Sequence, residues 1–189
     1  KSYLVPETCQ VHTLATPEQN AAASLEQLVA ALGAGAALPR LQAPQRPNRP
    51  TGRLTAPKVC KAVGALLPDN AIVIDEAITS GLMLGVMTAG CPRHDLITLT
   101  GGAIGQGLPN AVGAAIACPD RPVIALIGDG TAMYTIQALW TMARENLNVT
   151  AIIFNNASYS VLNVELDRVG ADEAGPKAKS QLDLHGPVL

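Results

Sequence analysis

Short apolar runs alternate with segments of helical spacing along most of the chain. The runs cover residues 71–74, 96–99, 123–127 and 149–154, and the segments between and before them that read as helices cover 58–67, 80–87, 108–117 and 132–145. Short β-branched runs separated by helices are typical of parallel βαβ units with right-handed crossovers. The pattern therefore predicts an α/β fold, in which a parallel sheet carries helices on both faces.

The first 57 residues follow a different pattern. A short strand is expected at 2–5, and a helix at 18–32, where Leu25, Leu28, Val29 and Leu32 recur at helical spacing. Residues 33–57 are rich in Gly, Ala, Arg and Pro, and proline supports neither ladder nor helix hydrogen bonds. We interpret 33–57 as a Pro-rich interdomain linker.

Composition narrows the class of protein. The chain has 189 residues, 48% of them hydrophobic and 15% charged, which favours a folded domain with a buried core over a disordered chain. The net charge is −2 and no basic stripe is present, so nucleic acid is not an expected partner. The apolar runs are far shorter than the roughly 20 residues that span a bilayer, so no membrane segment is expected.

The four cysteines form no C-x-x-C pair and are too sparse for a disulfide scaffold, and no export signal opens the chain. A reduced, cytoplasmic protein is therefore expected. The chain begins with Lys1 rather than Met, and we interpret it as processed or as a fragment of something longer.

Polar and glycine residues gather where the predicted strands end. In open α/β sheets, ligands bind beyond the carboxyl ends of the strands. Gly128-Asp129-Gly130 closes one strand and opens a helix, an arrangement that suits a phosphate. Asn155-Asn156 ends the next strand, so Asp129 and Asn156 should lie side by side. A carboxylate and an amide oxygen there suit Mg²⁺ shared with a diphosphate.

Each of these motifs, taken alone, is also compatible with a plainer role. Gly-Asp-Gly is often a simple turn, and Asn-Asn can merely end a strand. A dinucleotide-binding fold is disfavoured because Met133 stands where its third glycine should be and Asn155 where its acid should be. A Walker loop is excluded because the chain contains no Gly-Lys dipeptide.

Together and at this spacing, Gly128-Asp129-Gly130 and Asn155-Asn156 resemble the thiamine-diphosphate motif of a family of enzymes. That family includes acetolactate synthase, benzoylformate decarboxylase and pyruvate decarboxylase, and the resemblance covers roughly residues 58–168. It implies a thiamine diphosphate-binding fold with thiamine diphosphate and Mg²⁺ as cofactors. The implied metal ligands are the side chains of Asp129 and Asn156 and the backbone carbonyl of Ser158.

The resemblance also implies cofactor contacts elsewhere. Gly102 would offer a backbone carbonyl to the aminopyrimidine, and Ile104 would be the apolar wedge under the bent cofactor, although a plain core role for Ile104 stays open. Further cofactor contacts are implied for Ala77, Ile78, Thr79, Gly128, Gly130, Thr131, Tyr159 and Ser160. The wall of a substrate pocket is implied at Val161, Leu162 and Glu165.

The implied activity is decarboxylation of a 2-oxo acid, with transfer of the resulting carbanion to a second carbonyl, as in acetolactate synthase. Acetolactate synthases usually carry a Gln-Trp signature where this chain reads Asn163 to Arg168. Two alternatives therefore stay open: a simple decarboxylase of the benzoylformate decarboxylase type, and a non-catalytic paralogue that keeps the fold.

The resemblance further implies a domain plan. Residues 1–32 would be the C-terminal piece of a middle α/β domain, and 58–189 would be the diphosphate- and Mg-binding domain, truncated at its C-terminal end. The activating glutamate of the family belongs to a separate N-terminal domain, so no catalytic residue is assigned here. Because the family's cofactor lies between two chains, a homodimer or homotetramer is expected.

Overall fold

The computed structural model describes residues 5–34, 42–170 and 175–185. It divides into two compact units, Lys1–Leu41 and Gln42–Leu189. The first unit contains α1 (Ala21–Ala31), which begins three residues later than the expected helix because the Asn20 side chain accepts a hydrogen bond from the Ala23 N–H, at 3.1 Å, and caps it. The strand expected at 2–5 lies, except for Val5, outside the described residues.

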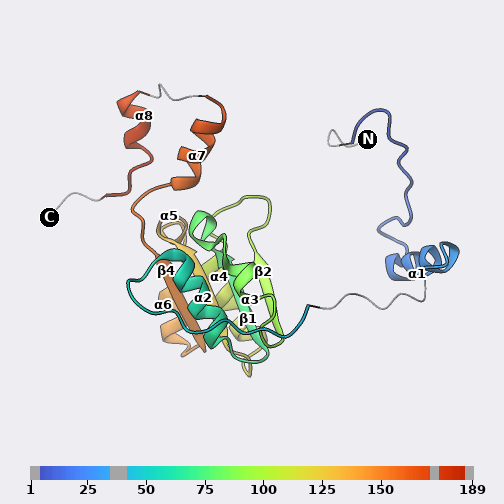
Figure 1. Ribbon diagram of the computed structural model, residues 1–189, viewed down its shortest axis with the longest axis horizontal. Helices are drawn as coiled ribbons and strands as arrows, with labels where there is room; N and C mark the ends of the chain where they lie inside the picture. Colours follow the sequence, from blue (N-terminus) through green and yellow to red (C-terminus); the bar gives the residue numbers. More distant parts are fainter. Residues whose placement is uncertain (1–4, 35–41, 171–174, 186–189) are drawn as a thin grey trace. The chain divides into compact units, whose positions relative to one another are not determined.

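The second unit is built on a parallel sheet (Figure 1). Among the described residues, this sheet has four strands in the order β2-β1-β3-β4. Their bounds are Ala71–Glu76 (β1), His94–Thr98 (β2), Val123–Gly128 (β3) and Val149–Phe154 (β4). Glu76 pairs with Ile127, and Gly128 with Phe154, so these three strands end at one edge of the sheet. The predicted parallel α/β fold is confirmed.

Helices cover both faces of the sheet, as the sequence predicts. Side chains of β1 alternate between two apolar clusters: Ile72 and Ile74 pack in one, and Ala71 and Val73 in the other. The first cluster includes residues of α4 (Gly107–Ala117), α5 (Asp129–Ala132) and α6 (Ala138–Arg144). The second includes residues of α2 (Ala56–Leu66) and α3 (Leu84–Thr88).

Two predicted helices are wrong as continuous elements. In place of a helix over 80–87, the structure has a 3₁₀ turn, η1 (Ile78–Gly81), followed by α3. In place of a helix over 132–145, α5 ends at Ala132 and α6 begins at Ala138. Between α5 and α6 the Thr135 hydroxyl donates to the Gly105 carbonyl oxygen at 2.8 Å. This contact with a distant loop accompanies the break, and apolar periodicity carries no signal for it.

The proline-rich segment from residue 42 onward belongs to the second unit and is hydrogen-bonded to the rest of it. The Gln45 N–H donates to the Gly90 carbonyl oxygen at 2.7 Å. The Arg46 guanidinium donates to the carbonyl oxygens of Ala65, at 3.0 Å, and Leu67, at 2.8 Å, where α2 ends. The interpretation of 33–57 as a linker, with domains on either side, stays a prediction.

Two further helices follow the sheet, α7 (Ser160–Arg168) and α8 (Pro176–Ser180). Within the described part of the chain, none of the helices has the length and apolar character needed to cross a membrane.

Candidate cofactor and metal site

A pocket opens at the carboxyl ends of β1, β3 and β4. The chain leaves β1 toward β2 on one side and returns in β3 on the other, and this change of direction is where open α/β sheets bind ligands. The pocket is lined by Ala77, Ile78, Thr79, Ser80, Ile104, Gly128, Asp129, Gly130, Thr131, Phe154, Asn156, Ser158, Tyr159, Ser160 and Val161. All but Ser80 and Phe154 were singled out by the sequence.

Three of the residues singled out by the sequence lie elsewhere. Gly102 sits outside the pocket lining, in the turn after β2, with φ +71°. Leu162 and Glu165 line a separate groove that they share with residues of α7 and of the α8 region. The structure therefore separates Val161 from the other two residues of the expected substrate wall.

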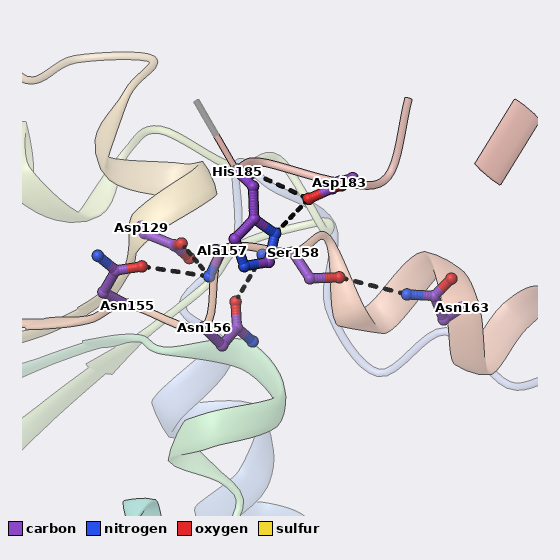
Figure 2. A network of polar contacts seen from close by, with 8 residues as sticks. All are labelled: Asp129, Asn155, Asn156, Ala157, Ser158, Asn163, Asp183 and His185. Atoms are coloured by element: carbon purple, nitrogen blue, oxygen red, sulfur yellow. Dashed lines mark hydrogen bonds and ion pairs between the residues drawn. The ribbon is translucent and has the colours of Figure 1, made fainter. Parts of the chain in front are cut away.

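The loops after β3 and β4 are tied together by Asp129. Its Oδ2 accepts the Ala157 N–H at 2.7 Å, and Asn155 Oδ1 accepts the same N–H at 3.2 Å (Figure 2). Ala157 has φ +52°, a conformation that non-glycine residues rarely adopt, and these two acceptors hold it there. The carboxylate of Asp129 and the Asn155-Asn156 pair thus lie side by side, as predicted.

The next residues, Asn156 and Ser158, also line the pocket. Asn156 Oδ1 accepts the Ser158 N–H at 3.1 Å. Ser158 stands opposite Asp183 in an antiparallel bridge whose hydrogen bonds come from the flanking residues Tyr159 and Leu184. The Ser158 carbonyl therefore points away from Asp183, and no hydrogen bond among the described residues uses its oxygen.

The oxygen atoms of these residues fit a magnesium ion. Asp129, Asn156 and Ser158 all line one pocket and carry hard oxygen atoms, and Mg²⁺ takes a few such oxygens and completes its octahedron with water and phosphate oxygens. Within the described residues, no group of three His, Cys, Asp or Glu is placed to hold a metal. The expected metal ligands thus include one carboxylate, so part of the positive charge of Mg²⁺ would be left for an anionic ligand to neutralise.

Tyr159 closes one side of this region. A Cβ atom added to Gly130 would lie 2.5 Å from the Tyr159 ring, so glycine is needed for the ring to pack on the backbone there. Partial burial raises the pKa of the Tyr159 phenol, and Tyr134 and the Asp129 carboxylate act in the same direction. The Tyr159 phenol therefore ionises at a higher pH than that of an ordinary tyrosine.

Glu76, at the end of β1, supports the opposite side of the pocket. Its side chain is buried, with 2% exposure, and its carboxylate accepts three successive backbone N–H groups: Gly105 at 2.8 Å, Gln106 at 3.1 Å and Gly107 at 2.9 Å. α4 has no capping side chain of its own, so Glu76 supplies the acceptor for its first turn. A Cβ atom on Gly107 would lie 2.6 Å from Glu76 Oε2.

The glycine-rich turn before α4 is fixed at several points. Gln106 Nε2 donates to the Ala103 carbonyl oxygen at 2.8 Å, and the Thr135 hydroxyl donates to that of Gly105. Ile104 is only partly buried and lines the pocket rather than joining the buried core. This placement favours the wedge position over the core role for Ile104.

Comparison with known proteins identifies the family of this chain. Residues 81–186 match the model of the thiamine pyrophosphate enzyme C-terminal TPP binding domain. The chain belongs to this family.

Relatives of known sequence support the same assignment. The chain is 53% identical over its whole length to "Putative acetolactate synthase large subunit IlvX" of Mycobacterium tuberculosis, and it spans 36% of that protein. It is 38% identical over 118 residues, 59% of the chain, to an alpha-keto-acid decarboxylase of Mycobacterium bovis, of which this match covers 19%.

Solved structures share the fold. A thiamine diphosphate-dependent 4-hydroxybenzoylformate decarboxylase of Rhodococcus jostii superposes with a TM-score of 0.68 at 31% identity, over 87% of this chain and 31% of that one. Benzoylformate decarboxylase of Polynucleobacter necessarius has a TM-score of 0.57 at 23% identity, over 77% and 27% of the two chains, and shows the fold alone.

Glu76 is among the residues expected near a ligand because it stands at the end of a predicted strand, but sequence reasoning assigned it no part in building this TPP binding domain. Two signals were present: an acidic residue ends an otherwise apolar strand, and the helix from Gly107 begins without a Ser, Thr, Asp or Asn cap. Neither signal says that the two belong together, because 29 residues separate Glu76 from the first N–H that it accepts.

Proposed function

We propose that this chain carries the diphosphate and Mg²⁺ half of the cofactor site of an enzyme that decarboxylates a 2-oxo acid and transfers the remaining unit to a second carbonyl compound. The observation that carries the proposal is that Asp129, Asn156 and Ser158, three residues with hard oxygen atoms, line one pocket and are joined by hydrogen bonds between their loops. Membership of the thiamine pyrophosphate enzyme family supports thiamine diphosphate as the anionic ligand.

The chain's residues would bind and orient the cofactor. Asp129, Asn156 and the Ser158 carbonyl would hold Mg²⁺ against the diphosphate, while Ile104 would support the bend of the cofactor. Further contacts would come from Gly102, Ala77, Ile78, Thr79, Gly128, Gly130, Thr131, Tyr159 and Ser160. When bound, thiamine diphosphate supplies the electron sink for decarboxylation, and the protein supplies position and a water-poor surround.

The acceptor step separates two candidate reactions. The relative IlvX, named for acetolactate synthase, favours carboligation. The 4-hydroxybenzoylformate decarboxylase structure, which superposes on 87% of the chain, favours simple decarboxylation. For either reaction, Val161 would belong to the substrate wall at the pocket, whereas Leu162 and Glu165 line the separate groove beside α7. A non-catalytic paralogue is the third candidate, because residues 163–168 lack the Gln-Trp pair.

Exposed apolar side chains support a homo-oligomer. Met133 is 67% exposed, Tyr134 59% and Trp140 63%, all within the stretch that includes α5 and α6. A homodimer or homotetramer would cover them, and sedimentation that shows only monomer with cofactor present would contradict this. A cytoplasmic location is proposed because four sparse cysteines without a C-x-x-C pair are typical of a reducing compartment.

The reaction is tested with the full-length protein, thiamine diphosphate and Mg²⁺. Pyruvate and benzoylformate are offered separately, and the products are identified by NMR. Acetolactate from pyruvate would support carboligation, whereas an aldehyde alone would support the simple decarboxylase. Cofactor binding without turnover of either 2-oxo acid, or of a wider panel, would contradict the enzyme and leave the non-catalytic paralogue.

A further inference from the structure

The side-chain amide of Asn156 is held at both of its polar atoms. The Ser158 backbone N–H can only donate, so the Asn156 atom that faces it at 3.1 Å must be the oxygen, Oδ1. The other atom, Nδ2, then donates to Ser160 Oγ at 2.9 Å. Hydrogen-bond chemistry therefore fixes which end of this amide is oxygen.

We infer that Ser160 is a positioning residue, which keeps the Asn156 amide turned with Oδ1 toward the metal ion. The inference rests on the proposed function, since it assumes that Asn156 Oδ1 is a metal ligand. A rotated amide would place its NH₂ group against both the Ser158 N–H and the cation, and neither can accept a hydrogen bond. The Ser160 hydroxyl can donate as well as accept, so the Ser158 N–H selects this orientation, and Ser160 holds the amide in it by accepting from Nδ2.

In the described part of the chain, the Ser160 hydroxyl neither caps a helix nor bonds to a second side chain. The hydrogen bond from Asn156 is the one that Ser160 Oγ makes among the described residues. α7 begins at Ser160, but no side chain caps this helix. Ser160 also lines the pocket, so the hydroxyl hydrogen, which the bond from Asn156 leaves unused, remains available to a phosphate oxygen.

The nearby Asn163 provides a matched control. Its Nδ2 donates to Ser158 Oγ at 3.3 Å, so this is also a hydrogen bond between side chains in the same loop and helix. It does not involve the amide of Asn156 or the carbonyl of Ser158. Asn163→Ala therefore removes a comparable contact without releasing the proposed ligand.

The test uses calorimetry on the full-length protein. It measures the Mg²⁺ concentration at which binding of thiamine diphosphate is half-maximal. Ser160→Ala is expected to raise this concentration roughly two- to tenfold, the effect of one neutral hydrogen bond. Ser160→Thr, which keeps the hydroxyl, and Asn163→Ala should both stay within about twofold of the parent.

A metal comparison separates positioning from general damage. Ca²⁺ tolerates less regular ligand geometry than Mg²⁺, so the Ser160→Ala loss should be smaller with Ca²⁺. Equal losses for both metals, or a loss that Thr does not rescue, would overturn the inference. The inference would also be overturned if Ser160→Ala needed the same Mg²⁺ concentration as the parent and the parent bound thiamine diphosphate in a metal-dependent way. A parent protein that shows no metal-dependent binding would overturn the proposed function, and this inference with it.

Discussion

Replacing Glu76 with alanine is expected to lower the free energy of unfolding of the second unit by several kcal/mol. The substitution leaves the N–H groups of Gly105, Gln106 and Gly107 without the carboxylate that now accepts them. Each buried N–H left unpaired costs about 1–3 kcal/mol, so the three together set a range of about 3–9 kcal/mol. Water entering the vacated space satisfies some of them, which gives an expected loss of about 3–5 kcal/mol.

Glutamine at position 76 refines the same argument. Its single amide oxygen can accept the N–H groups of Gly105 and Gln106, but its NH₂ group then faces the Gly107 N–H, which is also a donor. One unpaired donor and the lost charge should cost about 1–3 kcal/mol. Glu76→Gln is therefore expected to lie between the parent and Glu76→Ala.

Urea-induced unfolding of the chain, followed by far-UV circular dichroism, measures these losses. Amide hydrogen exchange of the peptide around residues 105–107 measures the same contacts locally, and protection should fall in both variants. Glu145→Ala is the control, because its partner Arg144 and Glu145 itself are exposed and such a pair is worth at most about 1 kcal/mol. If Glu76→Ala unfolds at the same urea concentration as Glu145→Ala and keeps the amide protection around residues 105–107, the capping role assigned to Glu76 is wrong.

Three further substitutions probe the same unit. Burial raises the pKa of the Asp75 carboxyl, although the Ala77 N–H opposes this. The folded state thus binds this proton more tightly than the unfolded chain, and ionisation costs stability as the pH rises from the ordinary pKa of aspartate through the raised one. Asp75→Asn should therefore gain stability relative to the parent at neutral pH and lose this gain in acid; a gain that persists in acid would contradict the reasoning. Gly107→Ala should cost about 1–3 kcal/mol because its Cβ would lie 2.6 Å from both Glu76 Oε2 and Ile127 Cδ1. Gly113 lies in the same helix with open space around it, so Gly113→Ala should instead raise the free energy of unfolding by about 0.5–1 kcal/mol. Equal urea midpoints for Gly107→Ala and Gly113→Ala would refute the packing argument.

The sequence predicted the sheet because buried parallel strands leave a strong local signal. Apolar runs such as 123–127 and 149–154 became β3 and β4 within one residue, and their carboxyl ends brought Asp129 beside Asn155-Asn156. These features follow from periodicity and strand topology alone. Most of the rest of the pocket lining, such as Ala77, Ile104 and Tyr159, was anticipated from the resemblance to the thiamine-diphosphate enzyme family.

The breaks and supports of the pocket could not be anticipated, because they depend on contacts between distant residues. The stretch 132–145 keeps helical spacing, yet it is interrupted where Thr135 bonds to Gly105. Likewise, Glu76 follows an apolar strand in a way that reads equally well as a surface residue. Its role needs the position of α4, which local sequence does not specify.

The most direct test of the account compares thermal unfolding of the full-length protein with thiamine diphosphate and Mg²⁺ against the same sample in EDTA. Saturation at about 100 times Kd should add roughly 2.7 kcal/mol and raise the Tm. Asp129→Asn keeps an acceptor for the Ala157 N–H but removes the charge, and it should lose most of this metal-dependent rise. No rise in the folded parent, or an equal rise in Asp129→Asn, would contradict the site described for Asp129, Asn156 and Ser158.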